Sequence, residues 1–246
     1  MKNKINIVIP MAGLGSRFAL AGYEKYKPFI DVAGKPMIER VILNLMIPDA
    51  RFILIGRSEH LVSDRETIER LKAQYDVEFL FLQKTTEGTA STVLHARELI
   101  NNESPLIIAN SDQIVDHSIE SFYSDCKSRD LDGSMMCFED SELNPKWSFA
   151  KIDNTTNHVI EVQEKVPISK YATVGIYLYM KGRYFVDSAI DMIINNDRVN
   201  NEFYTCPVYN YCIKRNLRIG AYLVSKDDMH GIGTPEDLSK YLESTR

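Results

Sequence analysis

The sequence lacks the long apolar run that a membrane span requires. None of its apolar stretches approaches the roughly 20 residues that cross a bilayer as a helix. The first residues lead directly into an apolar stretch typical of a strand, without the apolar core and cleavage site of a signal peptide. We therefore expect a cytoplasmic protein with no membrane partner.

An excess of positive charge is also absent. The 246 residues carry a formal net charge of −5, and basic and acidic residues are mixed along the chain. A nucleic-acid-binding protein would show a basic stripe or patch, so we expect no nucleic-acid partner. This charge balance still permits a local basic cluster that holds phosphate groups.

Cysteine is scarce and follows no metal-binding pattern. The four cysteines form no Cys-x-x-Cys pair, and no histidine lies at zinc-ligand spacing from them. The sequence therefore predicts reduced thiols, as is usual for cytoplasmic proteins. Internal repeats, low-complexity tracts and linkers are absent as well, which favours one compact domain over residues 1–246.

What the sequence does contain, in its first half, is an alternation of strand and helix patterns. Apolar runs at 5–9, 51–56, 77–82 and 106–109 are typical of buried strands, and helical spacing begins at Pro36 and covers 64–75 and 88–100. This alternation predicts an α/β fold with a parallel sheet covered on both faces. In such sheets ligands bind at the carboxyl ends of the strands.

The second half is first rich in strands and then helical. Strands are expected at 133–138, 149–153, 159–162, 173–180 and 219–224, and helices at about 183–195, at 209–215 and from Pro235, capped by Thr234. The tyrosine-rich stretch 204–211 is expected in the core or in the wall of an acceptor pocket, and the segment 201–204, just ahead of a helix, is a further candidate for that wall.

The turn after the first strand contains the first chemical signal. Gly13 and Gly15 follow an apolar strand, and they let the backbone bend and approach a ligand closely. Backbone N–H groups in such a turn can bind an anion, and Arg17 adds a permanent forked charge. We expect a nucleoside triphosphate to bind there, on residues Met11, Ala12, Gly13, Leu14 and Gly15.

A dinucleotide-dependent oxidoreductase is the first alternative for this turn. Its fingerprint needs a third glycine where this chain has Phe18, a helix directly after the turn, and an acidic residue after the second strand. We expect a long loop up to Lys35 instead of that helix, so this alternative is disfavoured.

Several motifs together resemble the sugar-phosphate nucleotidyltransferases, also called nucleotide-sugar pyrophosphorylases. Their order and spacing match over most of the chain. The motifs are Ala-Gly-Leu-Gly-Ser-Arg-Phe at 12–18, Lys-Pro-Phe at 27–29, Gly-Lys-Pro-Met-Ile at 34–38, Gln83 with Gly-Thr-Ala at 88–90, Asn-Ser-Asp at 110–112, Glu-Lys at 164–165, Val-Gly-Ile-Tyr at 174–177 and Gly-Thr-Pro-Glu-Asp-Leu at 233–238.

The resemblance implies both a fold and a reaction. The fold is a Rossmann-like three-layer sandwich with a mostly parallel mixed central sheet, as in glycosyltransferase-A-like proteins. Residues 1–130 would form its nucleotide-binding half and residues 131–246 its acceptor-binding half. The reaction, of EC 2.7.7 type, joins a nucleoside triphosphate to a phosphorylated acceptor and releases pyrophosphate, for example in the synthesis of capsule or other cell-surface polysaccharides.

The resemblance also implies roles for the basic residues. Arg17 would hold the triphosphate and the leaving pyrophosphate, and Lys27 would lie near the α-phosphate. Lys165 would bind the acceptor phosphate, Glu164 an acceptor hydroxyl, and Gly175 would let the acceptor approach.

Mg²⁺ is the implied cofactor, and Asp112 is its expected ligand. A hard cation binds one or two carboxylates together with phosphate oxygens. Many relatives provide another carboxylate at the position where this chain has Gly231, so Asp228 is the candidate replacement.

Gln83, Gly88, Thr89 and Ser111 are the remaining nucleotide-binding candidates. A glutamine amide can both donate and accept, so Gln83 favours a pyrimidine and leaves CTP, UTP and dTTP open. The acceptor also stays open: a sugar 1-phosphate is expected, and a ketose, polyol or other small phosphorylated compound used with CTP is the alternative. A non-catalytic nucleotide or metabolite sensor on the same fold is the alternative of another class. The sequence is compatible with a homo-oligomer.

Overall fold

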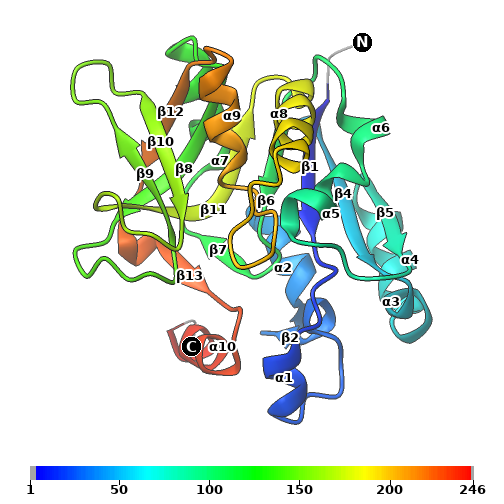
Figure 1. Cartoon of the computed structure of the whole chain (residues 1–246). Coiled ribbons are helices and arrows are strands. Elements are labelled where there is room, and N and C mark those ends of the chain that lie inside the picture. Colours follow the sequence, from blue (N-terminus) through cyan, green and yellow to red (C-terminus); the bar gives the residue numbers. More distant parts are fainter. Residues whose placement is uncertain (1–3, 245–246) are drawn as a thin grey trace.

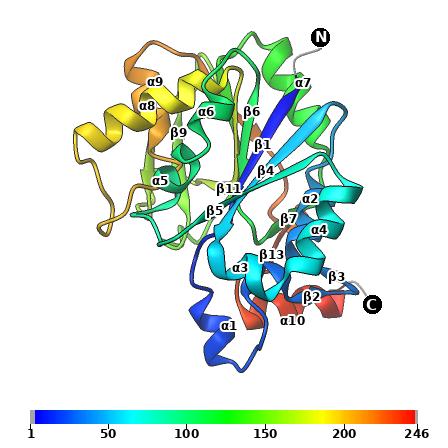
Figure 2. The same cartoon turned by 90° about the vertical axis from the view of Figure 1, so that its right-hand side faces the viewer.

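A mixed sheet runs through the middle of the protein, whose computed structural model describes residues 4–244 (Figures 1 and 2). Within those residues the sheet has nine strands in the order β10-β9-β11-β6-β1-β4-β5, and β8 pairs with both β11 and β12 beside this path. The strands are β1 (Ile5–Pro10), β4 (Ala50–Arg57), β5 (Val77–Leu82), β6 (Leu106–Ala109), β8 (Gly133–Glu139), β9 (Ser148–Ile152), β10 (Val159–Glu164), β11 (Tyr171–Tyr179) and β12 (Ile219–Leu223).

The direction of the strands follows the two halves of the sequence. Strands β1, β4, β5 and β6 are parallel, as the alternation of strands and helices predicts. Strand β11 then lies antiparallel to β6 and carries the strands of the second half on the same sheet. The predicted α/β fold with a mixed central sheet is confirmed.

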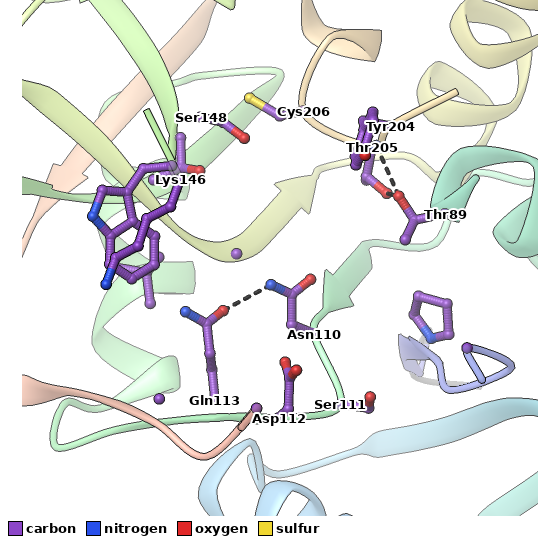
Figure 3. A pocket seen from close by; sticks show the side chains of 18 of the residues that line it. Thr89, Asn110, Ser111, Asp112, Gln113, Lys146, Ser148, Tyr204, Thr205 and Cys206 are labelled. Carbon is purple, nitrogen blue, oxygen red and sulfur yellow. Dashed lines mark hydrogen bonds between the residues drawn. The ribbon is translucent and has the colours of Figure 1, made fainter. Parts of the chain in front are cut away.

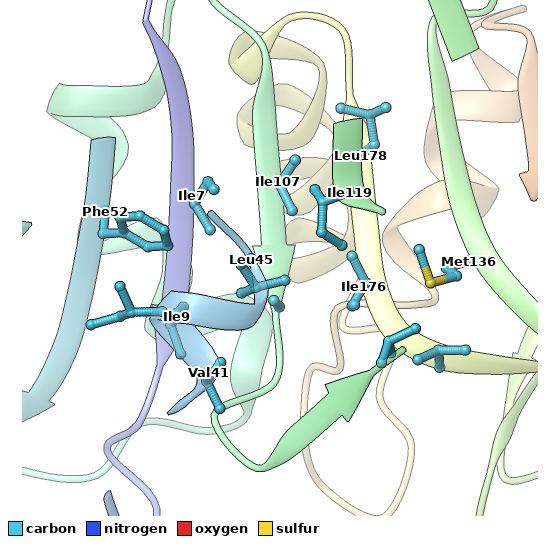
Figure 4. Close-up of a cluster of buried hydrophobic side chains, with 14 of the residues drawn as sticks. Ile7, Ile9, Val41, Leu45, Phe52, Ile107, Ile119, Met136, Ile176 and Leu178 are labelled. Carbon is cyan, nitrogen blue, oxygen red and sulfur yellow. The ribbon is translucent and has the colours of Figure 1, made fainter. Parts of the chain in front are cut away.

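Helices cover both faces of the sheet because alternate residues of a strand face opposite sides. On β1, Ile7 and Ile9 pack with one apolar cluster and Val8 with another. The first cluster, shown in part in Figure 4, includes residues of α2 (Met37–Asn44), α4 (Arg65–Gln74) and α7 (Ile119–Ser128). The second includes residues of α5 (Thr89–Leu94), α6 (Arg97–Ile100), α8 (Gly182–Ile194) and α9 (Val208–Lys214).

The segment after β1 differs from the expected long loop. It contains the short helix α1 (Ser16–Leu20), the 3₁₀ turn η1 (Lys27–Phe29) and a hairpin of β2 (Asp31–Val32) and β3 (Lys35–Pro36). The expectation that no helix follows the glycine turn was wrong, because Gly15 takes a left-handed φ of 63° that starts α1 directly. Phe18, in the place of a third glycine, is fully buried and anchors this helix.

Several short elements were not expected from the sequence. They are α3 (Ser58–Ser63), β7 (Gln113–Val115), α7, η2 (Lys226–Asp228) and β13 (Met229–Gly231), and the expected helix at 88–100 is divided into α5 and α6. The pairing of β13 with β7 matters most, because it brings the segment before α10 (Pro235–Ser244) against the residues that follow β6. Thr234 caps α10 as predicted, with its Oγ1 accepting from the N–H of Asp237 at 3.1 Å.

Two expectations about composition can be compared with the structure. The four cysteines are free and buried, as predicted. Within residues 4–244, no helix has both the length and the apolar character needed to cross a membrane.

Candidate active site

A cavity of about 650 Å³ lies at the carboxyl ends of β1 and β6 and extends along β11 (Figure 3). This is the edge of the sheet at which ligands of α/β proteins bind. Segments far apart in the sequence meet there, because parallel strands end at the same edge. Of the predicted site residues, those that line the cavity are Met11, Gly13, Gly15, Arg17, Lys27, Thr89, Ser111, Asp112, Glu164, Lys165 and Gly175.

The other five predicted site residues are not among those that line this cavity. Ala12 is buried in the apolar cluster that includes residues of α5, and Leu14 is 64% exposed. Gln83 is exposed beyond the end of β5, at the edge of the sheet. Gly88 lies behind a neighbouring segment, and Asp228 accepts from the N–H of Ser225 within its own turn at 3.3 Å.

The glycine turn brings the predicted triphosphate-binding residues next to Lys27. A Cβ on Gly15 would lie 3.0 Å from the Cβ of Lys27, and the left-handed φ of Gly15 disfavours any other residue. A Cβ on Gly13 would meet no atom of the described residues within 4 Å, so the backbone of this residue faces open space. Arg17 follows in the first turn of α1, with an exposed side chain.

Lys27 and Asp112 form an ion pair in the cavity. Their Nζ and Oδ2 atoms are 2.5 Å apart, and each side chain keeps about a quarter or less of its surface exposed, 20% for Lys27 and 26% for Asp112. The chain at 233 passes against the same carboxylate, since a Cβ on Gly233 would lie 2.6 Å from Asp112 Oδ2. Only a glycine leaves room for Asp112 to face the cavity at this point.

The carboxylates at this end suit a magnesium ion that also binds substrate phosphates. Asp112 and Asp237 both line the cavity, and a Cβ on Gly231 would lie 4.0 Å from the carboxylate of Asp237. Within residues 4–244, no group of three or more acidic, histidine or cysteine side chains could hold a metal without other ligands. One or two carboxylates with phosphate oxygens completing the shell is a usual arrangement for Mg²⁺.

Glu164 lies at the other end of the cavity, on the last position of β10. Its carboxylate accepts a short hydrogen bond from the hydroxyl of Ser148 on β9. Burial raises the pKa of Glu164, with the Ser148 hydrogen bond and the charge of Lys165 opposing this effect. A partly desolvated carboxylate in this position is an acceptor for a hydroxyl group of a bound molecule.

Lys165 follows Glu164 and turns its ammonium toward Tyr204. The Nζ of Lys165 donates to the Tyr204 hydroxyl at 2.7 Å and lies 4.5 Å from the centre of the same ring. The hydrogen bond to Tyr204 is the main cause of the raised pKa of Lys165. Lys165 is therefore a charged side chain on the cavity wall whose position is fixed by Tyr204. Tyr204 lies on the same wall, within the segment expected there.

Gly175 has a different neighbourhood from the one expected. Its φ is 91°, and a Cβ there would lie 2.2 Å from Asn110 Nδ2 and 2.4 Å from Gln113 Oε1. The amides of Asn110 and Gln113 are hydrogen-bonded to each other at 2.8 Å, as Figure 3 shows. The glycine in β11 therefore makes room for this amide pair, which lines the cavity just after the end of β6.

Gly88 is likewise accounted for by packing. A Cβ on Gly88 would lie 2.5 Å from the backbone N and O of Phe203. The next residue, Thr89, accepts at its hydroxyl oxygen from the N–H of Thr205 at 3.1 Å and from its hydroxyl at 2.9 Å (Figure 3). The turn at 88–89 thus holds residues 203–206 against the cavity.

Some residues of the cavity wall were not predicted. Asn110 belongs to a motif that the sequence already showed, and its position directly after a buried strand was the available signal. Asp237 also belongs to such a motif, at 233–238, although it fits an ordinary helix-capping pattern with Thr234 as well. Gln113 and Ser148 carried no comparable signal. Their approach to the cavity depends on the pairing of β13 with β7 and of β9 with β10.

Comparison with known proteins gives one family match. The family model described as "Nucleotidyl transferase" matches residues 7–218 of this chain. Among characterised sequences, the bifunctional protein GlmU of Methanocaldococcus jannaschii is 25% identical over 181 residues. That match covers 72% of this chain and 40% of the relative, so this chain spans less than half the length of that protein.

Solved structures share the whole fold. The nucleoside-diphosphate-sugar pyrophosphorylase from Vibrio cholerae RC9 is 26% identical with a TM-score of 0.82, and the match covers 96% of this chain and 99% of that chain. A UDP-glucose pyrophosphorylase complexed with UDP-glucose has a TM-score of 0.78 at 17% identity, covering 98% of both chains. At that lower identity the likeness concerns the fold alone.

Proposed function

Because the chain belongs to the nucleotidyl transferase family, we propose that it joins a nucleoside triphosphate to a phosphorylated sugar and releases pyrophosphate. One observation carries this proposal. A single cavity collects Arg17, Lys27, Asp112, Glu164 and Lys165 from separate segments of the chain. Two polyanions and a divalent cation require this combination of cations and carboxylates.

The chemistry is attack by a phosphate oxygen of the acceptor on the α-phosphorus of the triphosphate. The new P–O bond forms as the bond to pyrophosphate breaks in line, so the protein need not supply a nucleophile. Its residues hold the two substrates together and neutralise the charge that develops. Arg17 neutralises the leaving pyrophosphate, Lys27 the α-phosphate, and Lys165 the acceptor phosphate.

Asp112 has two partners in this proposal. It pairs with Lys27 in the structure, and it is the carboxylate that would hold Mg²⁺ together with Asp237. When bound, the ion would supply positive charge next to the phosphates. Lys27 is then free to donate to the α-phosphate, which replaces the carboxylate of Asp112 as its anionic partner. Asp228 does not enter this arrangement, because it is not among the residues that line the cavity, whereas Asp237 is.

A pyrimidine nucleotide is the proposed donor of the nucleotidyl group. The support is the amide of Gln83, which can donate to and accept from the edge of a pyrimidine base. Gln83 is exposed beyond the end of β5 and is not among the residues that line the cavity, so its amide is accessible to a base that extends from the cavity toward that edge of the sheet. The product would be an NDP-sugar, which fits a cytoplasmic step in the synthesis of a cell-surface polysaccharide.

A substrate panel tests the proposed function. The unmodified protein is incubated with Mg²⁺, with each of CTP, UTP, dTTP, ATP and GTP, and with sugar 1-phosphates or ketose, polyol and other small phosphorylated compounds. Pyrophosphate release is then measured. We expect release with a pyrimidine nucleotide and a sugar 1-phosphate. Release only with CTP and a polyol or ketose phosphate would change the acceptor class, and nucleotide binding without any release would identify a sensor instead.

A further inference from the structure

The backbone at Lys165 is held in a conformation that a lysine rarely adopts. Its φ is 59°, in the left-handed region, directly after the last residue of β10. Its N–H donates to the carbonyl of Trp147 at 3.0 Å, which fixes this turn of the chain. Unfavourable backbone geometry of this kind persists where the surroundings hold it, and it is common at functional sites.

The side chain of Lys165 is fixed by one residue, Tyr204. The Tyr204 hydroxyl accepts from Nζ at 2.7 Å, and the centre of the ring lies 4.5 Å from the same nitrogen. Burial and the neighbouring Glu202 raise the pKa of Tyr204, so the hydroxyl keeps its own proton. An ammonium has three N–H donors, so one is used by Tyr204 and two remain for a bound phosphate.

Tyr204 is in turn held by its two neighbours. Phe203 makes two backbone hydrogen bonds to the turn before α5, from its N–H to Glu87 at 2.8 Å and from Ala90 to its carbonyl at 2.9 Å. Thr205 donates to the Thr89 hydroxyl from both its N–H and its own hydroxyl. The ring of Tyr204 therefore lies on a segment that has little freedom to move.

We propose that Tyr204 is a positioning residue that orients the ammonium of Lys165 toward the acceptor phosphate. The hydroxyl sets the direction of the side chain, and the attraction between the charge and the neighbouring aromatic ring supports that direction. This inference rests on the proposed function in one respect, namely that the group bound by Lys165 is the phosphate of the acceptor.

The first experiment measures the freedom of Lys165 without using enzyme activity. The intact protein is acetylated with a limiting amount of acetic anhydride, and modification of each lysine is quantified by peptide mass spectrometry, with and without inorganic phosphate. Acetic anhydride reacts only with the neutral amine, and the hydrogen bond to Tyr204 stabilises the charged ammonium. We therefore expect Lys165 to be acetylated about tenfold faster in Tyr204→Phe than in the wild-type protein. Inorganic phosphate should slow the acetylation of Lys165 in the wild-type protein and slow it less in Tyr204→Phe.

Two controls accompany this measurement. Lys146 lines the same cavity but lies over Trp147, so its rate of acetylation should not change in Tyr204→Phe. Thermal melting shows that the variant is folded. Tyr211→Phe is the matched control variant, because it removes a tyrosine hydroxyl that donates to Asp197 at 3.0 Å instead of contacting Lys165, and it should leave the acetylation rate of Lys165 unchanged. An equal rate at Lys165 in Tyr204→Phe and in the unmodified protein would overturn the proposal.

The second experiment measures kinetics with the substrates that the panel identifies. Tyr204→Phe should raise the KM for the acceptor about tenfold and leave the KM for the nucleotide unchanged. In a Lys165→Met background the same change should have no further effect, because the residue that Tyr204 orients is gone. If Tyr204→Phe raised the acceptor KM equally in the wild-type and in the Lys165→Met protein, or raised the nucleotide KM, the proposed role of Tyr204 would be contradicted. Failure of the proposed function would appear separately, as no pyrophosphate release by the unmodified protein, and acetylation would still decide the role of Tyr204.

Discussion

The ion pair between Lys27 and Asp112 joins two residues that are 85 positions apart in the sequence. The resemblance to nucleotidyltransferases gave each a separate role, one on the α-phosphate and one on the metal ion. The structure adds that they are direct partners at 2.5 Å, which couples their charges. If a phosphate and a metal ion bind here as proposed, each would replace one partner of this ion pair.

Lys27→Ala and Asp112→Asn test this pair. Each should lower kcat by about 10²- to 10³-fold, the usual effect of losing one group that stabilises developing charge. The melting temperature should change little, because a partly exposed pair contributes only about 1 kcal/mol to the free energy of unfolding. Pyrophosphate release and thermal melting measure the two effects, with the exposed Lys25→Ala as control. Rates near those of the unmodified protein in both variants would remove these residues from the site.

Arg17→Ala tests the role of the glycine turn. Arg17 is exposed at the start of α1 and lines the cavity, so its guanidinium is available to the triphosphate. We expect the KM for the nucleotide to rise about tenfold and the KM for the acceptor to change less. Steady-state kinetics with either substrate varied distinguishes the two. A larger rise in the acceptor KM would reverse the assignment.

His60 gives a pH dependence of stability. Its imidazole is fully buried against Tyr26 and Phe29, and burial, aided by the charge of Arg57, lowers its pKa from 6.5 to about 4. The unfolded chain therefore binds more protons than the folded protein between these two values. The free energy of unfolding should fall as pH falls through this window, by about 3 kcal/mol in total.

Urea unfolding at several pH values measures this effect. In His60→Phe, which replaces the imidazole with another ring among Tyr26 and Phe29, the loss between pH 6.5 and about 4 should disappear. The exposed His95→Gln serves as control and should keep the pH dependence of the unmodified protein. The same slope in all three proteins would show that His60 is not its source.

At the scale of elements, the buried carboxylate of Glu39 joins helices α2 and α4 by pairing with two partly exposed cations. Its carboxylate has 1% of its surface exposed and pairs with Arg70 at 2.6 Å and Lys35 at 2.9 Å, and it accepts from the Tyr75 hydroxyl at 3.2 Å. The hydrogen bond from Arg70 is the main cause that lowers the pKa of Glu39 to about 2. The packing of these two helices on the first half of the sheet thus depends on a charged carboxylate.

Glu39→Gln should destabilise the protein by about 3 kcal/mol, because it leaves two cations facing a buried neutral group. The stabilisation from Glu39 is complete above pH 4.5 and is lost as pH falls toward 2, since the folded pKa lies below the ordinary one. Chemical denaturation at neutral and acid pH measures both effects. The exposed Glu236→Gln, paired with Lys240 on α10, is the matched control and should change little.

The whole molecule is organised by one sheet that carries two sets of loops to the same edge. Strand β11 lies beside β6, so the loops of the second half reach the loops of the first across the cavity. A nucleotide bound there would contact both halves and stabilise the folded protein as a unit. At a concentration of about 100 times Kd, the gain is about 2.7 kcal/mol.

For a protein of this length such a gain corresponds to a rise in melting temperature of roughly 5–10 °C. Differential scanning calorimetry with Mg²⁺ and each nucleotide measures it, and the pyrimidine nucleotides should give the largest shift. The same nucleotides should give no comparable shift with Lys27→Ala. Equal shifts for all five nucleotides would contradict the proposed pyrimidine preference.

The sequence by itself determined the fold class and the family. The spacing of apolar residues marks strands and helices because burial on a sheet or under a helix imposes periods that can be read directly from the chain. The glycine turn after the first strand indicated Gly15 and Arg17, and the resemblance to nucleotidyltransferases added Lys27, Asp112 and Lys165. All five residues line the cavity. The match of the family model to residues 7–218 confirms the predicted family.

Only the tertiary structure decided which residues touch one another. A glycine is conspicuous in a sequence, but Gly88 and Gly175 leave room for the backbone of Phe203 and the amides of Asn110 and Gln113, which no local pattern can show. Tyr204 contacts Lys165 from a segment that is held in place by the hydrogen bond between Thr205 and Thr89, which are 116 positions apart in the sequence. Local propensity depends on neighbours along the chain, whereas these contacts depend on loop paths and strand pairing that bring distant side chains within a few ångströms.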